Sequence, residues 1–431
     1  MISIPRVSDI FLISIVIGVA ISYSYLYLFH IIFAIIIIFS FRRFRKNDFK
    51  FDLNIFTTNY VYFLPLFFSW YLLSVLWSIN KAYSFQYLFY IFCGIGIILY
   101  IVININTEKK IKRSIKVLGG IFSIQIIFST LESFTSFRLP ISPFSDIVNF
   151  FGREPSLQPT LDSFLIPSLI QSPTGFQWNP NDLAIAMIML TPFFLFLKKN
   201  LIKWVAITLI SLIIIMTSSR SVLLSMGFLF IIYLIFYKKQ IMSVFLVFSI
   251  VTIFFSQIEN FKNSENTQIA DIANTFSAIS AFLSNDLLVG QSLSIRQELA
   301  LNGINALYET YGFGVGGGGS IAVQERMGGV DGRITSMHNF WLEVMVDSGI
   351  IFALIFYCWY LMLFRDLFKL GRYSKNYFFK YLGRSISLSL IVFIPASISA
   401  SSVIYFLPMW LLFGLAITTL EIHNKINLEE L

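Results

Sequence analysis

The run IFLISIVIGVAISYSYLYLFHIIFAIIIIFS, residues 10–40, contains no Asp, Glu, Lys or Arg. A helix rises 1.5 Å per residue and the hydrocarbon core of a bilayer is about 30 Å thick, so about twenty residues are enough to cross it. Since the run is too long for one helix without strong tilt, we predict two short helices, 10–22 and 25–41, that turn near residues 22–25. No small-residue cleavage site follows Arg6, and we expect no secretory signal peptide.

Apolar composition extends along the whole chain. Its 431 residues are 57% hydrophobic and 13% charged, and the mean hydropathy is +0.77. A soluble domain could not bury so much apolar surface, so the composition predicts a polytopic membrane protein. The three histidines are dispersed and both cysteines, Cys93 and Cys358, fall in apolar runs. This arrangement excludes a disulfide framework and a Cys/His metal site.

The apolar runs predict an all-α polytopic integral membrane protein of about 12 transmembrane helices, with both termini in the cytoplasm. Residues 1–257 would hold helices one to nine and an outer loop at 132–181. Residues 258–340 would form a large, partly helical extracytoplasmic loop, and residues 341–431 the last three helices and a cytoplasmic tail. The ten helices after the first pair are expected at 59–77, 84–104, 116–131, 182–197, 203–217, 221–236, 241–257, 341–364, 386–400 and 403–420.

The distribution of basic residues supports this topology. The ends and loops assigned to the cytoplasm hold 23 of the 31 Lys and Arg residues, as the positive-inside rule requires. This excess explains the net charge of +8 without a nucleic-acid partner. Arginine, whose planar fork grips phosphate through two parallel hydrogen bonds, dominates the opposite side, and we expect that face to bind phosphate. The arginines expected there are Arg138, Arg153, Arg220, Arg296, Arg326 and Arg333.

The large outer loop carries two helical patterns and a glycine-rich segment. Apolar residues recur at helical spacing over 269–283, and a second helix is expected over 294–311, with Arg296 on it. Gly314–Gly319 lacks the Gly-Lys-Ser/Thr ending of a nucleotide-binding loop. We expect these glycines to form a flexible hinge or to approach a substrate closely.

A lone histidine, His338, stands at the mouth of the tenth predicted helix. Histidine titrates near neutral pH, which suits a general base, and the positive end of the helix dipole would favour its neutral form. Glu343, further along the helix, could instead raise the pKa of His338 or orient its ring. The alternative is that His338 is only a polar residue that anchors the helix at the interface.

Arg220 lies in a tight corner between two apolar helices, where an unpaired guanidinium is unfavourable. No acid is close in sequence, so a distant acid or a bound anion would satisfy it. The alternative is an arginine that extends its side chain to the interface. Arg296 could likewise be an ordinary solvated residue of its helix.

Several short motifs together resemble the O-antigen ligase and polysaccharide polymerase superfamily, over about residues 70–420. Leu131-Glu132 with Arg138–Ser142 is similar to the branch typified by teichuronic acid polymerases. The motifs that carry the superfamily resemblance are Leu76–Ser78, Gly175–Ala184, Thr217–Arg220, Arg296, Gly312–Gly316 and His338–Glu343.

This resemblance implies a GT-C-like fold and a metal-independent, inverting glycosyl transfer without a cofactor. The donor would be an undecaprenyl-diphosphate-linked glycan, and the partners would be a glycan acceptor, the bilayer and other polysaccharide-assembly proteins. By motif match, Arg220 and Arg296 would bind the donor diphosphate and His338 would deprotonate the acceptor. We add four supporting candidates, Arg153, Arg333, Glu343 and Asn339, and two tryptophans for sugar stacking, Trp178 and Trp341.

The preferred interpretation is a polymerase of lipid-linked repeat units that builds a cell-surface polysaccharide. A ligase that transfers a finished glycan to another acceptor would need the same motifs. A transporter or flippase usually has repeated halves and ionisable groups near the bilayer midplane, whereas here the halves differ and charges gather at helix ends. A structural role in a synthesis complex is a further alternative.

Overall fold

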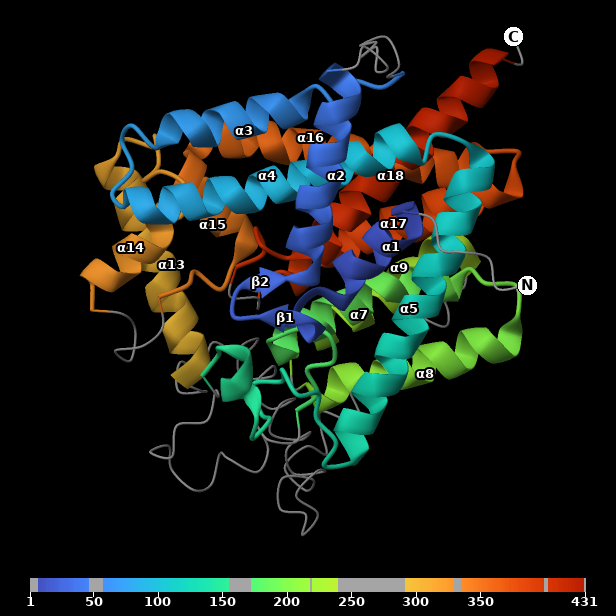
Figure 1. Ribbon diagram of the computed structural model, residues 1–431, viewed down its shortest axis with the longest axis horizontal. Coiled ribbons are helices and arrows are strands. Elements are labelled where there is room, and N and C mark those ends of the chain that lie inside the picture. The colour runs from blue at the N-terminus through green and yellow to red at the C-terminus, as the bar shows by residue number, and fades with distance from the viewer. Residues whose placement is uncertain are drawn as a thin grey trace.

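The computed structural model describes residues 7–45, 57–154, 172–217, 219–238, 291–328, 335–398 and 402–429 (Figure 1). Within these ranges the protein is almost entirely helical, and the one sheet there is a two-stranded hairpin. The elements are α1 (Val7–Ile17), η1 (Gly18–Ala20), β1 (Ser22–Tyr23), β2 (Leu26–Tyr27), α2 (Leu28–Arg45), α3 (Phe63–Ser74), α4 (Lys81–Asn104), α5 (Glu108–Phe134), η3 (Val148–Phe151), α7 (Pro180–Leu195), α8 (Asn200–Met216), α9 (Arg220–Ile232), η4 (Tyr233–Lys238), α13 (Gln291–Glu309), α14 (Gly319–Arg326), α15 (Phe340–Ser348), α16 (Ile350–Tyr373), α17 (Tyr377–Ala396) and α18 (Leu407–Glu429).

Five helices in the described ranges are long and apolar enough to cross a membrane: α4, α5, α9 with its extension η4, α16 and α17. Five more, α1, α2, α3, α7 and α8, are apolar but shorter. This fits a multi-pass, all-α membrane protein, whereas the count of twelve spans stays a prediction. The ninth predicted helix, 241–257, and the amphipathic pattern at 269–283 lie outside the described residues.

The first apolar run divides as predicted. Its two helices, α1 and α2, are joined by the β1–β2 hairpin, in which Ser22 pairs with Tyr27 and Tyr23 with Leu26. Ser24, in the turn, has a φ of +51°, a left-handed conformation that non-glycine residues adopt mainly in turns.

Side-chain caps fix where several helices begin. Asn80 and Asn179 accept backbone N–H groups at the starts of α4 and α7, at 3.0 Å from Ala82 N and 2.8 Å from Asn181 N. Such caps satisfy backbone donors that the first helical turn leaves without a partner. Asn179, the first residue of the Asn-Pro-Asn-Asp sequence, therefore fixes the start of α7.

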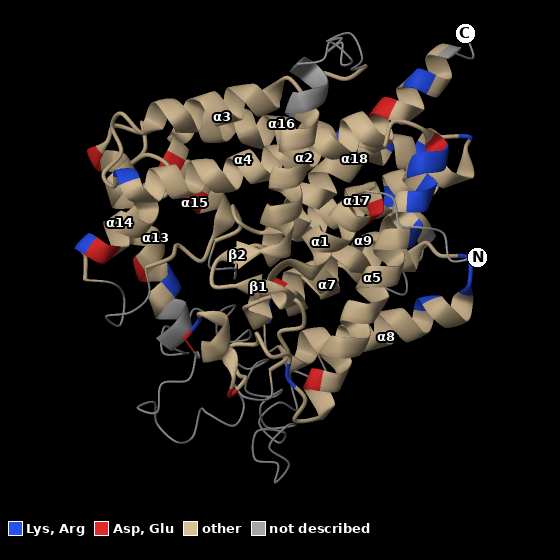
Figure 2. Cartoon of the chain, viewed as in Figure 1, with Lys and Arg blue, Asp and Glu red and all other residues tan. Residues whose placement is uncertain are grey.

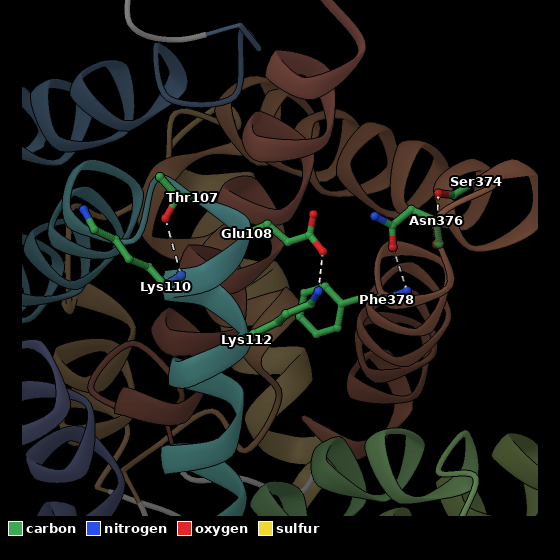
Figure 3. A network of polar contacts seen from close by, with 7 residues as sticks. All are labelled: Thr107, Glu108, Lys110, Lys112, Ser374, Asn376 and Phe378. Atoms are coloured by element: carbon green, nitrogen blue, oxygen red, sulfur yellow. Dashed lines mark hydrogen bonds and ion pairs between the residues drawn. The ribbon is translucent and has the colours of Figure 1, made fainter. Parts of the chain in front are cut away.

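A polar network joins the starts of α5 and α17 (Figure 3). Thr107 caps α5 by accepting from Lys110 N at 3.4 Å, and Asn376 caps α17 by accepting from Phe378 N at 2.9 Å. Lys112 pairs with Glu108 on α5 and its ammonium lies 5.2 Å from the ring centroid of Phe378. The basic run 109–116 thus lies inside a helix that begins eight residues before the predicted fifth span.

Helix α17 is the centre of the bundle and packs against α16, α7, α9 and α18. It crosses α16 backbone to backbone, because a Cβ on Gly383 would lie 2.5 Å from Gly371 N. Ser389 Oγ donates to Met189 O of α7 at 2.6 Å. Small residues and interhelical hydrogen bonds are what allow helices to pack closely in a membrane.

The tenth predicted helix, 341–364, is wrong as a single helix. It is broken at Gly349 into α15 and α16, where the φ of Gly349 is +86°. Phe313 of the glycine-rich segment lies at the break, since a Cβ on Gly349 would be 2.4 Å from Phe313 O. Glycine is needed here for its positive φ and for this close backbone approach, which hydropathy alone does not reveal.

Helices α13, α14 and α15 lie together at one end of α3 and α4, on the left of Figure 1. Figure 2 shows Lys and Arg gathered at the other end of the bundle, on the right, over the starts of α5 and α8 and the end of α18. The charge asymmetry predicted from the sequence therefore separates two ends of the structure.

Candidate functional site

The C-terminal end of α17 joins two distant parts of the chain. Ser221 Oγ, at the start of α9, donates to Ala396 O at 3.4 Å. The Phe340 N–H, at the start of α15, donates to Ser397 O at 3.2 Å. Because Ala396 and Ser397 are adjacent, the first turns of α9 and α15 lie at the same end of α17. The segments around residues 220 and 338 are therefore neighbours in space.

His338 is half-buried and has a φ of +47°, a left-handed conformation that is unfavourable for a residue with a Cβ. Its neighbour Met337 is buried, with its Sδ accepting from Gln324 Nε2 at 3.3 Å. The Met337 side chain packs so tightly on α13 that a Cβ on Gly303 would lie 2.6 Å from Met337 Cε. Packing on the preceding residue thus holds His338 in its strained backbone conformation.

On the other side of His338, Asn339 is the N-cap of α15. Its Oδ1 accepts from Leu342 N at 3.2 Å. Asn339 therefore positions His338 directly before the helix, where the positive end of the helix dipole favours a neutral imidazole.

Arg220 and Arg296 lie close enough to act on each other. Arg220 is the first residue of α9, Arg296 belongs to the first two turns of α13, and both side chains are half-buried. Burial lowers the pKa of Arg296, and the charge of Arg220 lowers it further. Among the described residues, neither guanidinium forms an ion pair with a carboxylate. Two guanidinium groups near each other have the chemistry to bind an anion such as a phosphate.

Glu343 does not bind His338 through its hydrogen bonds. Its Oε1 accepts from Tyr87 OH at 2.5 Å and from Ser402 Oγ at 2.7 Å, and its Oε2 has no hydrogen-bond partner. The predicted contact with the imidazole is therefore replaced by a link from α15 to α4 and to the segment before α18. Burial raises the pKa of Glu343, and the nearby carboxyl of Asp347 raises it further.

Asp347, one turn beyond Glu343 on α15, holds the glycine-rich segment. Its two carboxyl oxygens accept from Gly318 N and Ser320 N, each at 2.9 Å. Burial raises the pKa of Asp347, and these two N–H groups oppose the rise.

The glycine-rich segment is closely packed in this structure, and the expected hinge or substrate contact stays a prediction. Residues 314–320 are buried. A Cβ on Gly316 would lie 2.6 Å from Ser78 Cβ, and one on Gly314 would lie 2.5 Å from Gly349 N. The glycines are needed for close approach to α15 and to the turn before α4, and they make this end of the bundle rigid.

Arg153 and Trp178 form a second group, in the outer loop between α5 and α7. Arg153 Nε donates to Ser24 O of the β hairpin at 2.8 Å, and its guanidinium carbon lies 4.4 Å from the ring centroid of Trp178. Both residues line a cavity of about 870 Å³, and no part of its lining comes from Arg220, Arg296 or His338.

Trp341 is enclosed by other aromatic side chains. Its Nε1 donates to Ile394 O at 3.0 Å, and its ring contacts Phe356, Tyr360 and Phe393. Trp341 thus packs α15 onto α16 and α17, and Trp178 is the better placed of the two tryptophans to contact a sugar. Arg333 lies outside the described residues.

Sequence reasoning missed the partners that hold α15 in place. Nothing in the local sequence distinguishes Tyr87 or Ser402 from other hydroxyl residues of the chain. Asp347 could have been found, because a carboxyl inside an apolar helix is unfavourable without a partner. Among the described residues, no three His, Cys, Asp or Glu side chains are grouped as ligands for a metal ion.

The site combines a titratable imidazole at a helix start with two guanidinium groups that lack a carboxylate partner in the described ranges. Such a set can bind a diphosphate and accept a proton. Comparison with known families shows that residues 183–357 match the model for O-Antigen ligase, a range that includes Arg220, Arg296 and His338. Comparisons with curated proteins and with solved structures gave no match.

Proposed function

We propose that this chain is a member of the O-antigen ligase and polysaccharide polymerase superfamily and that it polymerises lipid-linked repeat units into a cell-surface polysaccharide. The match of residues 183–357 to the O-Antigen ligase model supports this proposal. The donor is an undecaprenyl-diphosphate-linked glycan, and the growing polymer is of the teichuronic acid type that the branch resemblance implies. The reaction takes place at the extracytoplasmic face of the cytoplasmic membrane, where we place α13, α14 and α15.

In this proposal His338 removes the proton from an acceptor hydroxyl. The freed oxygen attacks the anomeric carbon of the donor sugar from the side opposite the diphosphate, so the configuration inverts. The bond from carbon to phosphate oxygen breaks, and its electron pair stays on the departing lipid diphosphate. Arg220 and Arg296 stabilise the charge that develops there. His338 then releases its proton to water.

The observation that supports the proposal is that the segments carrying Arg220 and His338 lie at the same end of α17, with Arg296 near Arg220. Arg220 and Arg296 interact electrostatically, and the starts of α9 and α15 bind adjacent carbonyl groups of that end. A leaving diphosphate needs cations beside it, and the acceptor needs a base on the other side of the reacting carbon. Half-burial of both arginines strengthens their interaction with an anion relative to a fully solvated pair.

A ligase is the second candidate, because the matched family carries the description O-Antigen ligase. The same base and arginines would serve it. The acceptor would then be a different molecule from the donor.

Reconstitution separates these two activities. The purified full chain in liposomes receives one substrate, a lipid-diphosphate-linked repeat unit, and products are resolved by size. We expect a ladder of products that needs no second acceptor. No product from the single substrate, together with transfer once a separate acceptor is added, would establish the ligase instead.

Two histidine variants accompany this assay: His338→Ala, which removes the proposed base, and His423→Ala as its control. His423 lies on α18 near its C-terminal end, where its Nε2 lies 3.1 Å from Asn427 Nδ2. We expect His423→Ala to give the wild-type ladder, which shows that removal of an imidazole elsewhere is tolerated.

A further inference from the structure

The cavity beside Arg153 is built from several separate parts of the chain. Its walls come from the end of α1 and η1, the β1–β2 hairpin, the start of α2, α4, the loop that ends in Trp178, the start of α7, and the segment that leads into α18. Its volume of about 870 Å³ lies in the range of roughly 300–1,000 Å³ typical of ligand pockets.

One atom of Arg153 and the carboxyl of Asp182, both in the lining of this cavity, have no hydrogen-bond partner in the described ranges. The Arg153 Nη2 atom is buried and makes no hydrogen bond. Asp182, at the start of α7, is 5% exposed, and no hydrogen bond or ion pair of its carboxyl occurs among the described residues. Buried polar groups are nearly always hydrogen-bonded, so both groups are available to a ligand.

The rest of the lining has the chemistry of a sugar-binding site. Trp178, Tyr90 and Tyr405 offer aromatic faces, and Gln86 and Gln177 offer amide groups. A sugar ring presents apolar C–H faces and a rim of hydroxyl groups. Aromatic rings suit the faces, whereas amides, a carboxylate and a guanidinium suit the rim.

An apolar slot continues from this cavity toward the opposite end of α7. The slot has a volume of about 290 Å³ and lies between α5, α7 and α18, with side chains such as Phe122, Met189 and Leu411 in its walls. Pro408 lines both the slot and the cavity, and α7 contributes Asp182 to the cavity and Met189 to the slot. The two spaces therefore follow one another along the seam of α7 and α18.

We propose that the cavity and the slot together form a second binding site for a lipid-linked glycan, separate from the arginine pair. A sugar of the glycan occupies the cavity, where Arg153 and Asp182 bind its polar groups. The lipid chain lies in the slot. This inference rests on the proposed polymerase activity and deepens it, because a polymerase of lipid-linked units holds a donor and an acceptor at once.

The part of the cavity wall formed by Tyr405 lies near α15, the helix that His338 precedes. Tyr405, which lines the cavity, follows Ser402 by three residues, and Ser402 Oγ donates to Glu343 Oε1 at 2.7 Å. Glu343 belongs to α15, five residues after His338. A glycan in the cavity is thus close to the segment that carries the base.

Two glycines of α5 give a test of the slot with a matched control. Gly119 lines the slot, and a Cβ there would meet no atom within 4 Å. Its neighbour Gly120 is equally unobstructed but does not line the slot. Gly119→Phe should fill the slot without disturbing the helix, whereas Gly120→Phe adds the same side chain on a different side of α5.

The probe is undecaprenyl-diphosphate-linked N-acetylglucosamine, with the farnesyl analogue as a short-chain comparison. Binding stoichiometry and affinity are measured on the full chain in nanodiscs, in a His338→Ala background so that no turnover occurs. We expect two bound undecaprenyl probes per chain. Arg220→Gln should remove one of them, and Arg153→Gln with Asp182→Asn should remove the other.

Gly119→Phe should weaken binding at the cavity site at least about tenfold for the undecaprenyl probe and leave the farnesyl probe unaffected, whereas Gly120→Phe changes neither. One bound probe that is lost only with Arg220→Gln would overturn the second site. Unchanged affinity in both Gly119→Phe and the Arg153/Asp182 double variant would overturn it as well. Because this assay measures occupancy and not transfer, its failure is distinct from a failure of the polymerase proposal.

Discussion

Arg113 and Arg220 both belong to long apolar helices, yet their surroundings differ. Arg113 of α5 forms an ion pair with Asp9 of α1, with its Nε at 3.0 Å from Asp9 Oδ2. Arg220 of α9 has Arg296 as its charged neighbour, and neither has a carboxylate partner in the described part of the chain. The first arrangement is internally neutral and fastens two helices together. The second carries an uncompensated positive charge among the described residues, which suits an anion.

The comparison separates a structural arginine from a candidate binding arginine by their partners. A fold gains nothing from holding two half-buried guanidinium groups near each other, because like charges repel. Such an arrangement is typical of sites whose purpose lies in a ligand. Removal of Arg220 or Arg296 should therefore lower activity, whereas removal of Arg113 should lower thermal stability.

The largest contrast is expected from glutamine substitutions. Arg220→Gln or Arg296→Gln should lower kcat/KM about 10²–10³-fold, as removal of a group that stabilises transition-state charge does, with little loss of thermal stability. Arg113→Gln should lower the melting temperature in detergent and leave the activity of the folded fraction near that of wild type. Equal losses of activity in all three variants would show that the comparison is mistaken.

Lysine substitutions sharpen the same contrast. Arg220→Lys keeps the charge but loses the planar fork, so we expect a loss nearly as large as that of Arg220→Gln. Arg326→Lys, at the exposed end of α14, is the control and should be neutral. Full activity in Arg220→Lys would count against bidentate binding of the diphosphate.

A smaller effect, on the pH dependence of stability, is expected from the acidic residue Glu343. Asp9 is paired with Arg113, whereas Glu343 has two hydroxyl partners and a raised pKa, about 8 against an ordinary value of 4.5. The folded protein therefore binds a proton that the unfolded chain releases. This contribution to stability is fully present below about pH 4.5 and is lost as the pH rises through about 8.

Thermal unfolding in detergent between pH 5 and 9 tests this expectation. The melting temperature of the wild type should fall toward pH 9, and Glu343→Gln should flatten the dependence. The control is Glu325→Gln, since Glu325 also accepts a hydrogen bond from a tyrosine, Tyr83, but is exposed. The same flattening in Glu325→Gln would mean that burial of Glu343 is not the cause.

No effect at all is expected from removal of divalent metal ions. If the arginine pair neutralises the diphosphate, EDTA should leave the activity of the purified enzyme unchanged. Strong inhibition that Mg²⁺ reverses would assign neutralisation of the diphosphate to a metal ion. The difference between Arg113 and Arg220 would then have no bearing on donor binding.

Sequence patterns predicted most helices because hydropathy is a local property. The helix expected over 182–197 corresponds to α7, and the one expected over 294–311 corresponds to α13, which carries Arg296. The break at Gly349 could not be predicted in this way. It depends on Phe313, more than thirty residues earlier in the chain, whose carbonyl occupies the space that a side chain would need.

The candidate site, like the fold, was predictable from the sequence only in part. Residue type and position near a helix end singled out His338 and Arg220, whereas Arg296 was selected by the motif resemblance. Their proximity depends on the end of α17, which binds the starts of both α9 and α15 through backbone carbonyl groups. Any residue supplies a backbone carbonyl, so the sequence of α17 contains no signal of this contact. The same is true of Tyr87 and Ser402, which hold Glu343.

The most direct test of the central claim is the combined measurement of donor binding and polymer formation by His338→Ala in liposomes. We expect donor affinity within about twofold of wild type, an unchanged melting temperature, and a rate of polymer formation lower by about 10²–10⁴-fold, as loss of a general base predicts. A normal ladder of products from His338→Ala would contradict the account.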